Sequence, residues 1–458
     1  MELKNLFSPK SIAVIGANES DGFGGAVCKN LLNDFKYQNN LYFVSKNHNE
    51  VYGKKCYKTI LDIENDIDLL IIATNKNTVL DVLNDAKQKK VKAAVVYASG
   101  FSETLKEEDV LREEELKKIS IETGILILGP NCAGFVNYID HINAFAFLSD
   151  KRERKGDIGI VSQSGMISLS FIDNQWPKMS YNISCGNSNI IKFTDYIDFL
   201  IDDENTNVIA LHIDVIKNIF LFEECLKKAK NKNKPIVLYK SGSSEKSKLI
   251  SKNHTGGEDL INNDDFNKLI KKYDCIRADD TEELIYISTF LSVSKCRIKG
   301  NGIASLNLSG GEAGVACDVG SMYDISFPDF KSDLVDYLYE NLPSYAKVSN
   351  PLDMTATLSY DTEKLTIVLE KVLMQDNIDI ILIGYTILNH IDDNCIYYIL
   401  DAIKNIKQKS KNNNKPIILL SFMSNTREQK CIEKLMKLGV VAMPSPKYTF
   451  SIIEKLII

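Results

Sequence analysis

The chain of 458 residues is long enough for about three domains of ~150 residues each, and its 44% hydrophobic and 25% charged residues are typical of soluble globular proteins. Its 55 Lys and Arg against 61 Asp and Glu give a formal charge of −6, so we expect neither a nucleic acid partner nor an anionic membrane partner. No apolar run reaches the ~20 residues of a membrane helix, and the start of the chain lacks the apolar core of a secretory signal. The ten cysteines form no C-x-x-C pair, so we expect a cytoplasmic location, reduced thiols and no metal site.

The first segment, residues 1 to about 145, alternates short apolar runs with longer amphipathic ones. Short buried strands separated by stretches of helical length predict βαβ units and a parallel sheet covered on both faces. The predicted strands are Ser11–Ile15, Leu41–Val44, Asp68–Ala73, Ala93–Tyr97 and Ile125–Leu128, and the predicted helices are Ala26–Asp34 and Thr78–Lys89. We therefore predict one doubly wound nucleotide-binding domain.

The same alternation restarts twice. The polar run Asp150–Asp157 predicts a linker or hairpin at the first boundary, and Lys299–Gly302 introduces the second. In the second segment we predict strands Ile158–Val161, Tyr181–Ser184, Val208–Ile213 and Pro235–Tyr239 and helices Met166–Asn174 and Leu221–Lys230; in the third, strands Ile303–Leu308, Ile378–Gly384 and Pro416–Phe422 and a helix from Glu312. Ile158–Gly165 and Ile303–Gly311 share the order of apolar strand, Ser/Gly turn and helix, so we interpret them as recurring α/β units.

A glycine-rich turn, Gly16 to Gly25, follows the first predicted strand and precedes a helix. Backbone N–H groups in such a turn can approach a phosphate, and the helix N-terminus adds positive potential. Asn18 stands where the second glycine of a G-x-G-x-x-G fingerprint belongs, so a plain tight turn remains the alternative. The second strand ends in Ser45-Lys46-Asn47, where an NAD enzyme would have an acidic residue for the ribose, and this favours CoA or NADP over NAD.

The turn Ser162-Gln163-Ser164-Gly165 leads into a predicted helix. Two hydroxyls and a glycine at a helix N-terminus form a natural phosphate cradle. The alternative is that Ser162 or Ser164 only caps the helix.

The chain has five histidines. His212 lies within an apolar strand, which favours a histidine of the core, and His48, His141 and His390 lie in polar loops. His254 lies in a glycine-containing segment, Lys252 to Gly257, of the kind that lets a side chain reach a reacting group.

Seven short motifs, read in order, resemble those of the α subunit of ADP-forming (NDP-forming) acyl-CoA synthetases, relatives of the succinyl-CoA synthetase α subunit. Each motif is weak alone, but the ordered set is specific. The motifs are Ser11–Ala17, Leu128–Gly134, Val161–Gly165, Ser184–Asn187, Tyr239–Gly242, His254–Gly256 and Ser349–Asp353.

The resemblance implies an α/β protein with a CoA-binding Rossmann-like domain, residues 1–145, followed by two flavodoxin-like CoA-ligase domains, residues 150–295 and 296–458. It implies a ligase that interconverts acyl-CoA, phosphate and ADP with free acid, CoA and ATP. In this reaction an acyl phosphate forms first, and its phosphoryl group then passes to a histidine.

Matched residue by residue, the resemblance makes His254 the phosphorylated histidine and Asp214 its acidic partner. A carboxylate beside an imidazole fixes the tautomer and stabilises the positive charge that develops on attack. The resemblance assigns phosphate binding to Ser162, Gln163, Ser164, Gly165, Gly186 and Asn187, and CoA binding to Gly16, Ala17, Asn18, Gly22, Gly24, Gly25, Ser45, Lys46, Ser99, Gly100 and Asn131.

The chain departs from the family pattern at three places. The family usually has Glu where this chain has Asp214, small residues where it has Gly257–Leu260, and Asn-Pro-Lys where it has Ser45–Asn47. These departures leave open a CoA-binding regulatory protein of the same fold, and the Rossmann-like start with Lys46 leaves open an NADP-dependent oxidoreductase.

The resemblance also implies a partner. No G-x-x-x-x-G-K-[ST] loop is present, and the pattern of the α subunit accounts for all three predicted domains, which leaves none for an ATP-grasp module. We therefore expect ATP or ADP with Mg²⁺ to bind an ATP-grasp β subunit, in a heterotetramer, with a small carboxylic acid or acyl-CoA as substrate.

Overall fold

The computed structural model describes residues 2–34, 37, 39–149, 154–174, 176–242, 244, 246–247, 261–388, 390–391, 393–409, 415–424 and 429–458. The chain divides into two compact units, Met1–Ser288 and Thr289–Ile458. The predicted histidine loop, His254 to Leu260, and the predicted linker residues Asp150 to Glu153 lie outside the described residues.

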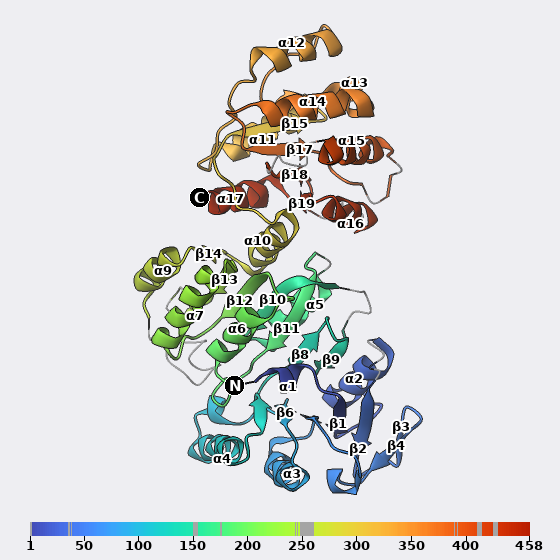
Figure 1. Ribbon diagram of the computed structural model, residues 1–458, viewed down its shortest axis with the longest axis vertical. Coiled ribbons are helices and arrows are strands. Elements are labelled where there is room, and N and C mark those ends of the chain that lie inside the picture. The colour runs from blue at the N-terminus through green and yellow to red at the C-terminus, as the bar shows by residue number, and fades with distance from the viewer. Residues whose placement is uncertain are drawn as a thin grey trace. The chain divides into compact units, whose positions relative to one another are not determined.

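The first sheet confirms a doubly wound parallel arrangement (Figure 1). Its strands, in spatial order, are β3 (Glu50–Val51), β4 (Lys54–Tyr57), β2 (Asn40–Val44), β1 (Ser11–Ile15), β5 (Leu69–Ile72), β6 (Ala93–Val96) and β7 (Leu126–Leu128), all parallel except the β3–β4 pair. The associated helices are α1 (Lys4–Phe7), α2 (Phe23–Lys29), α3 (Lys76–Lys89) and α4 (Glu107–Thr123). Every residue of β1, β5 and β6 is buried, as expected for strands covered on both faces.

The glycine-rich turn is shorter than the sequence suggested. Helix α2 begins at Phe23, so Gly24 and Gly25 are helical, and a π-helical segment, Asn30–Asp34, follows it. A Cβ on Gly24 would lie 2.2 Å from the Gly16 carbonyl oxygen, and one on Gly25 would lie 2.0 Å from that of Ser20. These glycines therefore let the first helical turn pack onto the preceding loop.

The second sheet also has a parallel centre. Its strands, in spatial order, are β14 (Ile276–Arg277), β13 (Ile236–Lys240), β12 (Val208–Ile213), β10 (Lys155–Ser162), β11 (Met179–Ser184), β8 (Gly134–Asn137) and β9 (Ile142–Phe145). The helices that follow these strands are α5 (Gly165–Asp173), α6 (Phe193–Asp202), α7 (Ile219–Asn231), α9 (Asn263–Lys272) and α10 (Thr281–Ser294). Figure 1 shows α6 and α7 along one face of this sheet.

The boundary between the two sheets differs from the composition-based prediction. Strands β8 and β9 precede residue 145, yet β8 pairs antiparallel with β11 and so belongs to the second sheet. Lys155 to Asp157, part of the predicted polar linker, already lie in β10. The division into three domains stays a prediction, because the first compact unit contains both sheets.

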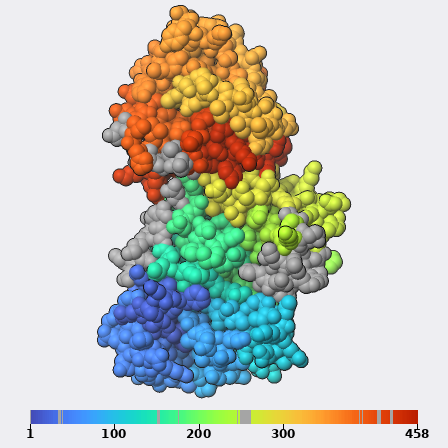
Figure 2. Space-filling model, turned by 180° about the vertical axis from the view of Figure 1, so that it is seen from behind, coloured from blue at the N-terminus to red at the C-terminus, as the bar shows by residue number. Residues whose placement is uncertain are grey.

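The two sheets of the first unit share a hydrophobic core. Phe7 of α1 packs edge-on against Phe135 of β8, with ring centroids 5.0 Å apart, and against Phe199 of α6 at 4.9 Å. The same cluster of buried side chains includes Val14 of β1 and Leu211 of β12. In Figure 2 the blue and cyan surface of the first sheet region directly adjoins the green surface of the second.

The second unit contains a five-stranded parallel sheet. Its strands, in spatial order, are β16 (Leu352–Asp353), β15 (Ile303–Asn307), β17 (Ile380–Gly384), β18 (Ile417–Leu420) and β19 (Val441–Met443). Its helices are α11 (Gly310–Gly320), α12 (Ser332–Asn341), α13 (Thr355–Ser359), α14 (Thr362–Met374), α15 (Cys395–Lys409), α16 (Gln429–Lys437) and α17 (Pro446–Leu456). Whether this sheet forms a second flavodoxin-like domain stays a prediction.

Two further sequence expectations bear on the whole chain. Seven of the ten cysteines are buried, which confirms the expectation of mostly buried thiols. In the part of the chain that the structure describes, no helix is long and apolar enough to cross a membrane.

Candidate functional site

The second sheet has a topological switch point at β10, which lies between β11 and β12. The chain passes from β10 to one neighbour and then crosses to the other, so the loops at the carboxyl ends of β10 and β12 diverge. Ligands bind in this crevice in open α/β sheets. Ser162 ends β10 and Asp214 follows β12, so two groups of predicted site residues meet here.

The turn at the end of β10 is held by its own serines. Ser164 caps α5, because its Oγ accepts a hydrogen bond from the Ile167 N–H at 3.4 Å. Ser162 is fully buried, and its Oγ donates to the Ser164 carbonyl oxygen at 2.9 Å and accepts from the Ser164 N–H at 3.1 Å. The first turn of α5 contains no acidic residue, so its N-terminal dipole is available to an external anion.

Gln163 ties this turn to the end of β12. Its Oε1 accepts hydrogen bonds from the N–H groups of Asp214 at 2.6 Å and Val215 at 2.9 Å, and its Nε2 donates to the Val215 carbonyl oxygen at 2.9 Å. These three bonds use the side chain amide as a fixed bridge. Gln163 therefore positions the Asp214 backbone beside the N-terminus of α5.

His212 is a site contact that sequence reasoning did not identify. It is buried in β12, as predicted for a core histidine, but its Nδ1 lies 3.3 Å from Ser162 Oγ and its Nε2 lies 3.9 Å from Asp214 Oδ1. The same Asp214 oxygen accepts a hydrogen bond from Ser241 Oγ at 2.5 Å. The only sequence signal was the spacing of His212 and Asp214, which places both side chains on one face of a strand.

Gly186 and Asn187 bring the two sheets of the unit together. Gly186 has φ +60°, and a Cβ there would lie 2.4 Å from the Pro130 carbonyl oxygen and 2.7 Å from that of Asn131. The Asn187 N–H donates to the Pro130 carbonyl oxygen at 3.1 Å, and Asn131 Nδ2 donates to Asn187 Oδ1 at 3.1 Å. Predicted CoA and phosphate residues therefore touch at this turn.

A buried polar network surrounds that turn, and sequence reasoning missed it. Asn187 Nδ2 donates to Glu103 Oε2 at 2.7 Å and to Glu113 Oε2 at 3.0 Å, and Asn189 Nδ2 donates to Glu113 Oε1 at 2.8 Å. Lys217 Nζ donates to the Asn187 carbonyl oxygen at 2.7 Å and to Asn189 Oδ1 at 2.6 Å. Burial lowers the pKa of Lys217, and the Glu113 carboxylate partly opposes that shift.

The other predicted CoA residues lie at the carboxyl edge of the first sheet. Asn18 Nδ2 donates to the Gly16 carbonyl oxygen at 2.9 Å, and Asn18 Oδ1 accepts from the Ser20 N–H at 3.0 Å, so Asn18 shapes the turn. Ala17 is buried beside it. Gly22 has φ +147° and precedes α2.

Lys46 is exposed at the end of β2, where Ser45 is buried. Lys58, which the sequence did not single out, donates to the carbonyl oxygens of Lys46 and His48, both at 3.2 Å. Lys58 therefore fixes the loop that presents Lys46.

Ser99 and Gly100 follow β6 on the same edge of the sheet. Ser99 is exposed, and the Gly100 N–H donates to Glu103 Oε1 at 2.6 Å. Because Glu103 also accepts from Asn187, this loop is connected to the turn at Gly186.

The structure thus brings most predicted site residues into two neighbouring edges, joined through Asn131 and Asn187. It brings Ser162 to Gly165 beside Asp214, but His254, the predicted phosphorylated residue, lies outside the described residues.

Comparison with known proteins gives two family matches. The profile of the CoA binding domain matches residues 10–138, and that of the succinyl-CoA ligase like flavodoxin domain matches residues 155–291.

Curated relatives extend the similarity along the chain. The α subunit of acetate–CoA ligase (ADP-forming) II from Pyrococcus furiosus is 31% identical over 97% of this chain and 95% of its own length. Acetate–CoA ligase (ADP-forming) from Methanocaldococcus jannaschii is 35% identical over 77% of this chain but only 49% of its own length. The chain spans about half the length of this relative and of others like it.

Among solved structures, the dinucleotide-forming acetyl-coenzyme A synthetase 1 of Ca. Korarchaeum cryptofilum, in complex with phosphate and ADP, has a TM-score of 0.83. The alignment covers 99% of this chain and 96% of that one at 24% sequence identity. At this identity the likeness establishes a common fold.

The first prediction concerns the joint at Gly186. Gly186→Ala should lower the free energy of unfolding by about 1–3 kcal/mol or more, because the substitution combines a left-handed backbone with a clash against the Pro130 carbonyl. Urea unfolding of the variant measures the change.

Gly53→Ala is the matched control, since Gly53 also has positive φ, +73°, but a Cβ there meets nothing within 4 Å. We expect the control to lose clearly less stability. Equal losses in the two variants would show that the close approach at Gly186 does not matter.

Proposed function

The chain belongs to the family of ADP-forming acetate–CoA ligase α subunits, and we propose that it acts as the α subunit of an ADP-forming acyl-CoA synthetase. In this function it interconverts acyl-CoA, phosphate and ADP with free acid, CoA and ATP. The relatives described above are CoA ligases and synthetases, and they give no support to an NADP-dependent oxidoreductase or to a purely regulatory protein.

One observation carries the proposal. The Ser162–Gly165 turn lies at the N-terminus of α5 and at the switch point of its sheet, and Gln163 ties it to Asp214. A helix N-terminus without acidic residues in its first turn favours a phosphoryl group. The chemistry of phosphoryl transfer depends mainly on such positioning and fixed dipoles.

We propose two steps on this chain. In the first, a phosphate oxygen attacks the thioester carbonyl carbon, the C–S bond breaks, and acyl phosphate and CoA thiolate result. In the second, a nitrogen of the His254 imidazole attacks phosphorus, the bond between phosphorus and the acyl oxygen breaks, and the carboxylate leaves. The Asp214 carboxylate would stabilise the charge on the histidine, and the N–H groups at the start of α5 would bind the phosphoryl oxygens.

CoA would bind at the carboxyl edge of the first sheet. The match of the CoA binding domain to residues 10–138 supports this assignment, as do the positive φ of Gly16 and the exposed ammonium of Lys46. Residues Gly22 to Gly25, Ser99 and Asn131 would complete the site. The proposed domains are residues 1–145 for CoA, and 150–295 and 296–458 for two flavodoxin-like domains.

We propose that the nucleotide binds a partner. The similarity to subunits named α supports a second subunit. In our proposal that subunit has an ATP-grasp fold, binds ATP or ADP with Mg²⁺, and forms a heterotetramer with this chain in the cytoplasm.

The second prediction concerns CoA. Lys46→Ala should weaken CoA binding up to about fivefold in calorimetry, the upper end for an exposed ion pair, and should leave dephospho-CoA binding unchanged if Lys46 contacts the ribose phosphate. Lys118→Ala, an exposed lysine of α4, is the control and should change neither affinity. Equal weakening of both ligands by Lys46→Ala would place the contact elsewhere.

The third prediction concerns the partner. The purified 458-residue chain should not form ATP from acyl-CoA, phosphate and ADP, and addition of a matching ATP-grasp subunit should start ATP formation. A coupled luciferase assay measures this difference. Rapid ATP synthesis by the chain alone would contradict the proposed division of labour.

The fourth prediction concerns His254. Incubation with acyl-CoA and labelled phosphate should give a protein label that acid removes and base preserves, as expected for a phosphoramidate. His254→Asn should abolish the label. Asp214→Asn should slow labelling by about 10²–10⁴-fold, the usual contribution of such a group, and leave CoA affinity unchanged.

His141→Asn is the control for this experiment, because His141 lies in the turn between β8 and β9, away from the proposed phosphoryl site. It should be labelled like the parent chain. An acid-stable label, or a label that persists in His254→Asn, would contradict the assignment.

A further inference from the structure

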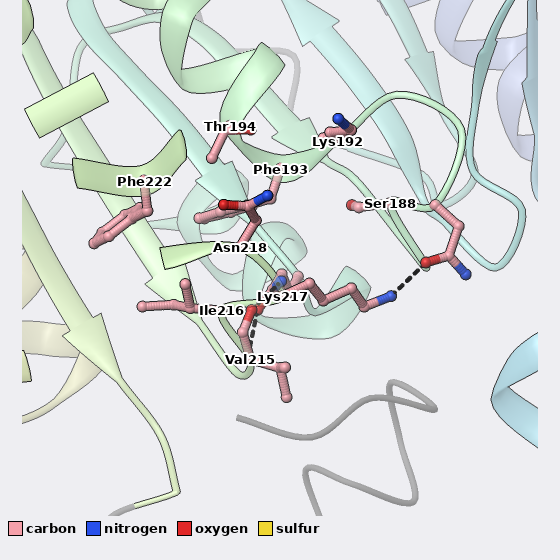
Figure 3. A pocket seen from close by; sticks show the side chains of 11 residues that line it. Ser188, Lys192, Phe193, Thr194, Val215, Ile216, Lys217, Asn218 and Phe222 are labelled. Carbon is pink, nitrogen blue, oxygen red and sulfur yellow. Dashed lines mark hydrogen bonds between the residues drawn. The ribbon is translucent and has the colours of Figure 1, made fainter. Parts of the chain in front are cut away.

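A cavity of about 230 Å³ adjoins the proposed phosphoryl site (Figure 3). Gln163, which bridges the α5 turn to Asp214 and Val215, forms part of its wall. The remaining walls come from the loop after β12, from the segment that leads into α6 and from the first turns of α6 and α7. The two steps proposed above leave the binding site of the acyl group unassigned.

Lys217 lines this cavity, and its ammonium has no carboxylate in direct contact. Its Nζ donates to two neutral oxygens, those of the Asn187 carbonyl and the Asn189 side chain. Among the described residues no carboxylate lies within 4.0 Å of this ammonium; Glu113 acts on it electrostatically from behind the Asn187 and Asn189 amides. A cation that is removed from water is stabilised by an anion, and two bonds leave one of its three protons for a ligand.

A second ammonium and an apolar wall complete the cavity. The exposed Lys192 lies on its rim, and Figure 3 shows Phe193 and Ile216 among the side chains that line it. Phe193 and Ile216 are buried, as is Phe222 beside them. The cavity thus offers cationic donors on one side and hydrocarbon on the other.

The lysines and the apolar wall together favour an organic carboxylate over inorganic phosphate as the ligand. Inorganic phosphate would satisfy the lysines but would leave the aromatic and aliphatic wall without a partner. A carboxylate attached to an apolar body satisfies both. The volume of about 230 Å³ is more than the methyl group of acetate needs.

We propose that this cavity binds the carboxylic acid substrate, with the carboxylate near Lys217 and an apolar body larger than a methyl group against Phe193 and Ile216. The substrate class is a monocarboxylic acid with several apolar carbon atoms. The identification of the ligand as substrate rests on the proposed function, but binding of the acid does not require turnover.

The fifth prediction tests binding to the full chain by calorimetry, with acetate, butanoate, 4-methylpentanoate and inorganic phosphate as probes. Affinity should rise about fourfold for each buried methylene from acetate to 4-methylpentanoate. Lys217→Met should weaken 4-methylpentanoate at least tenfold, and Lys217→Arg should keep affinity within threefold of the parent.

Lys234→Met is the matched control. Lys234 is also a lysine whose pKa is lowered by burial and whose Nζ donates to backbone carbonyls, but it does not line this cavity. It should leave all four affinities unchanged. Thermal unfolding checks that each variant is folded. If Lys217→Met does not fold, Lys192→Gln at the exposed rim is the deciding variant. We expect it to lose about threefold in affinity for 4-methylpentanoate.

Three results would overturn the proposal: equal affinity for acetate and 4-methylpentanoate, loss of phosphate binding without loss of acid binding in Lys217→Met, or unchanged acid binding in the deciding variant. The second would assign the cavity to phosphate. A chain that binds the acids as expected but never carries an acid-labile label would instead contradict the proposed function and leave the cavity assignment standing.

Discussion

The geometry of the candidate site depends on one close approach, that of Gly186 to the carbonyl groups of Pro130 and Asn131. Any Cβ at residue 186 would overlap both oxygens, so only glycine allows the loop after β11 to lie against the loop after β7. The Asn187 N–H then reaches the Pro130 carbonyl, and the Asn131 amide reaches the Asn187 side chain. Two sheets that fold from separate stretches of sequence thereby share one turn.

The hydrogen bonds among the buried polar groups around this turn hold it in one conformation. Glu113 is almost fully buried, yet it accepts bonds from the Asn187 and Asn189 amides and from the Ser102 N–H. Buried carboxylates and amides are costly when unpaired and fix one arrangement when all are satisfied. Lys217 ends this network at the edge of the cavity, so the same bonds that join the sheets also orient the ammonium proposed to meet the substrate.

Local sequence patterns predicted the repeated elements well and the long-range pairings poorly. Strands β1 and β12 were predicted at their observed bounds, because short apolar runs between turn residues determine them. The pairing of β8 with β11 was not predicted, because the amino-acid composition of a strand does not show that it joins a parallel sheet in the antiparallel direction. Lys217 and Glu113 were missed for the same reason: 104 positions separate Glu113 from Lys217 in the sequence, and only folding brings them near.

The two Ser/Gly turns, before α5 and before α11, have the same backbone pattern, but one side chain gives their helix N-termini different charges. Ser309 caps α11 as Ser164 caps α5, each through its Oγ. The first turn of α11, however, contains Glu312, whose carboxylate accepts a bond from the Leu308 N–H, and whose pKa is raised by burial and by nearby Asp353. A carboxylate in the first turn of a helix already interacts with its N-terminal dipole and repels a second anion. The two turns therefore share a backbone pattern but differ in charge, and of the two only the α5 turn has an N-terminus free of acidic side chains in its first turn.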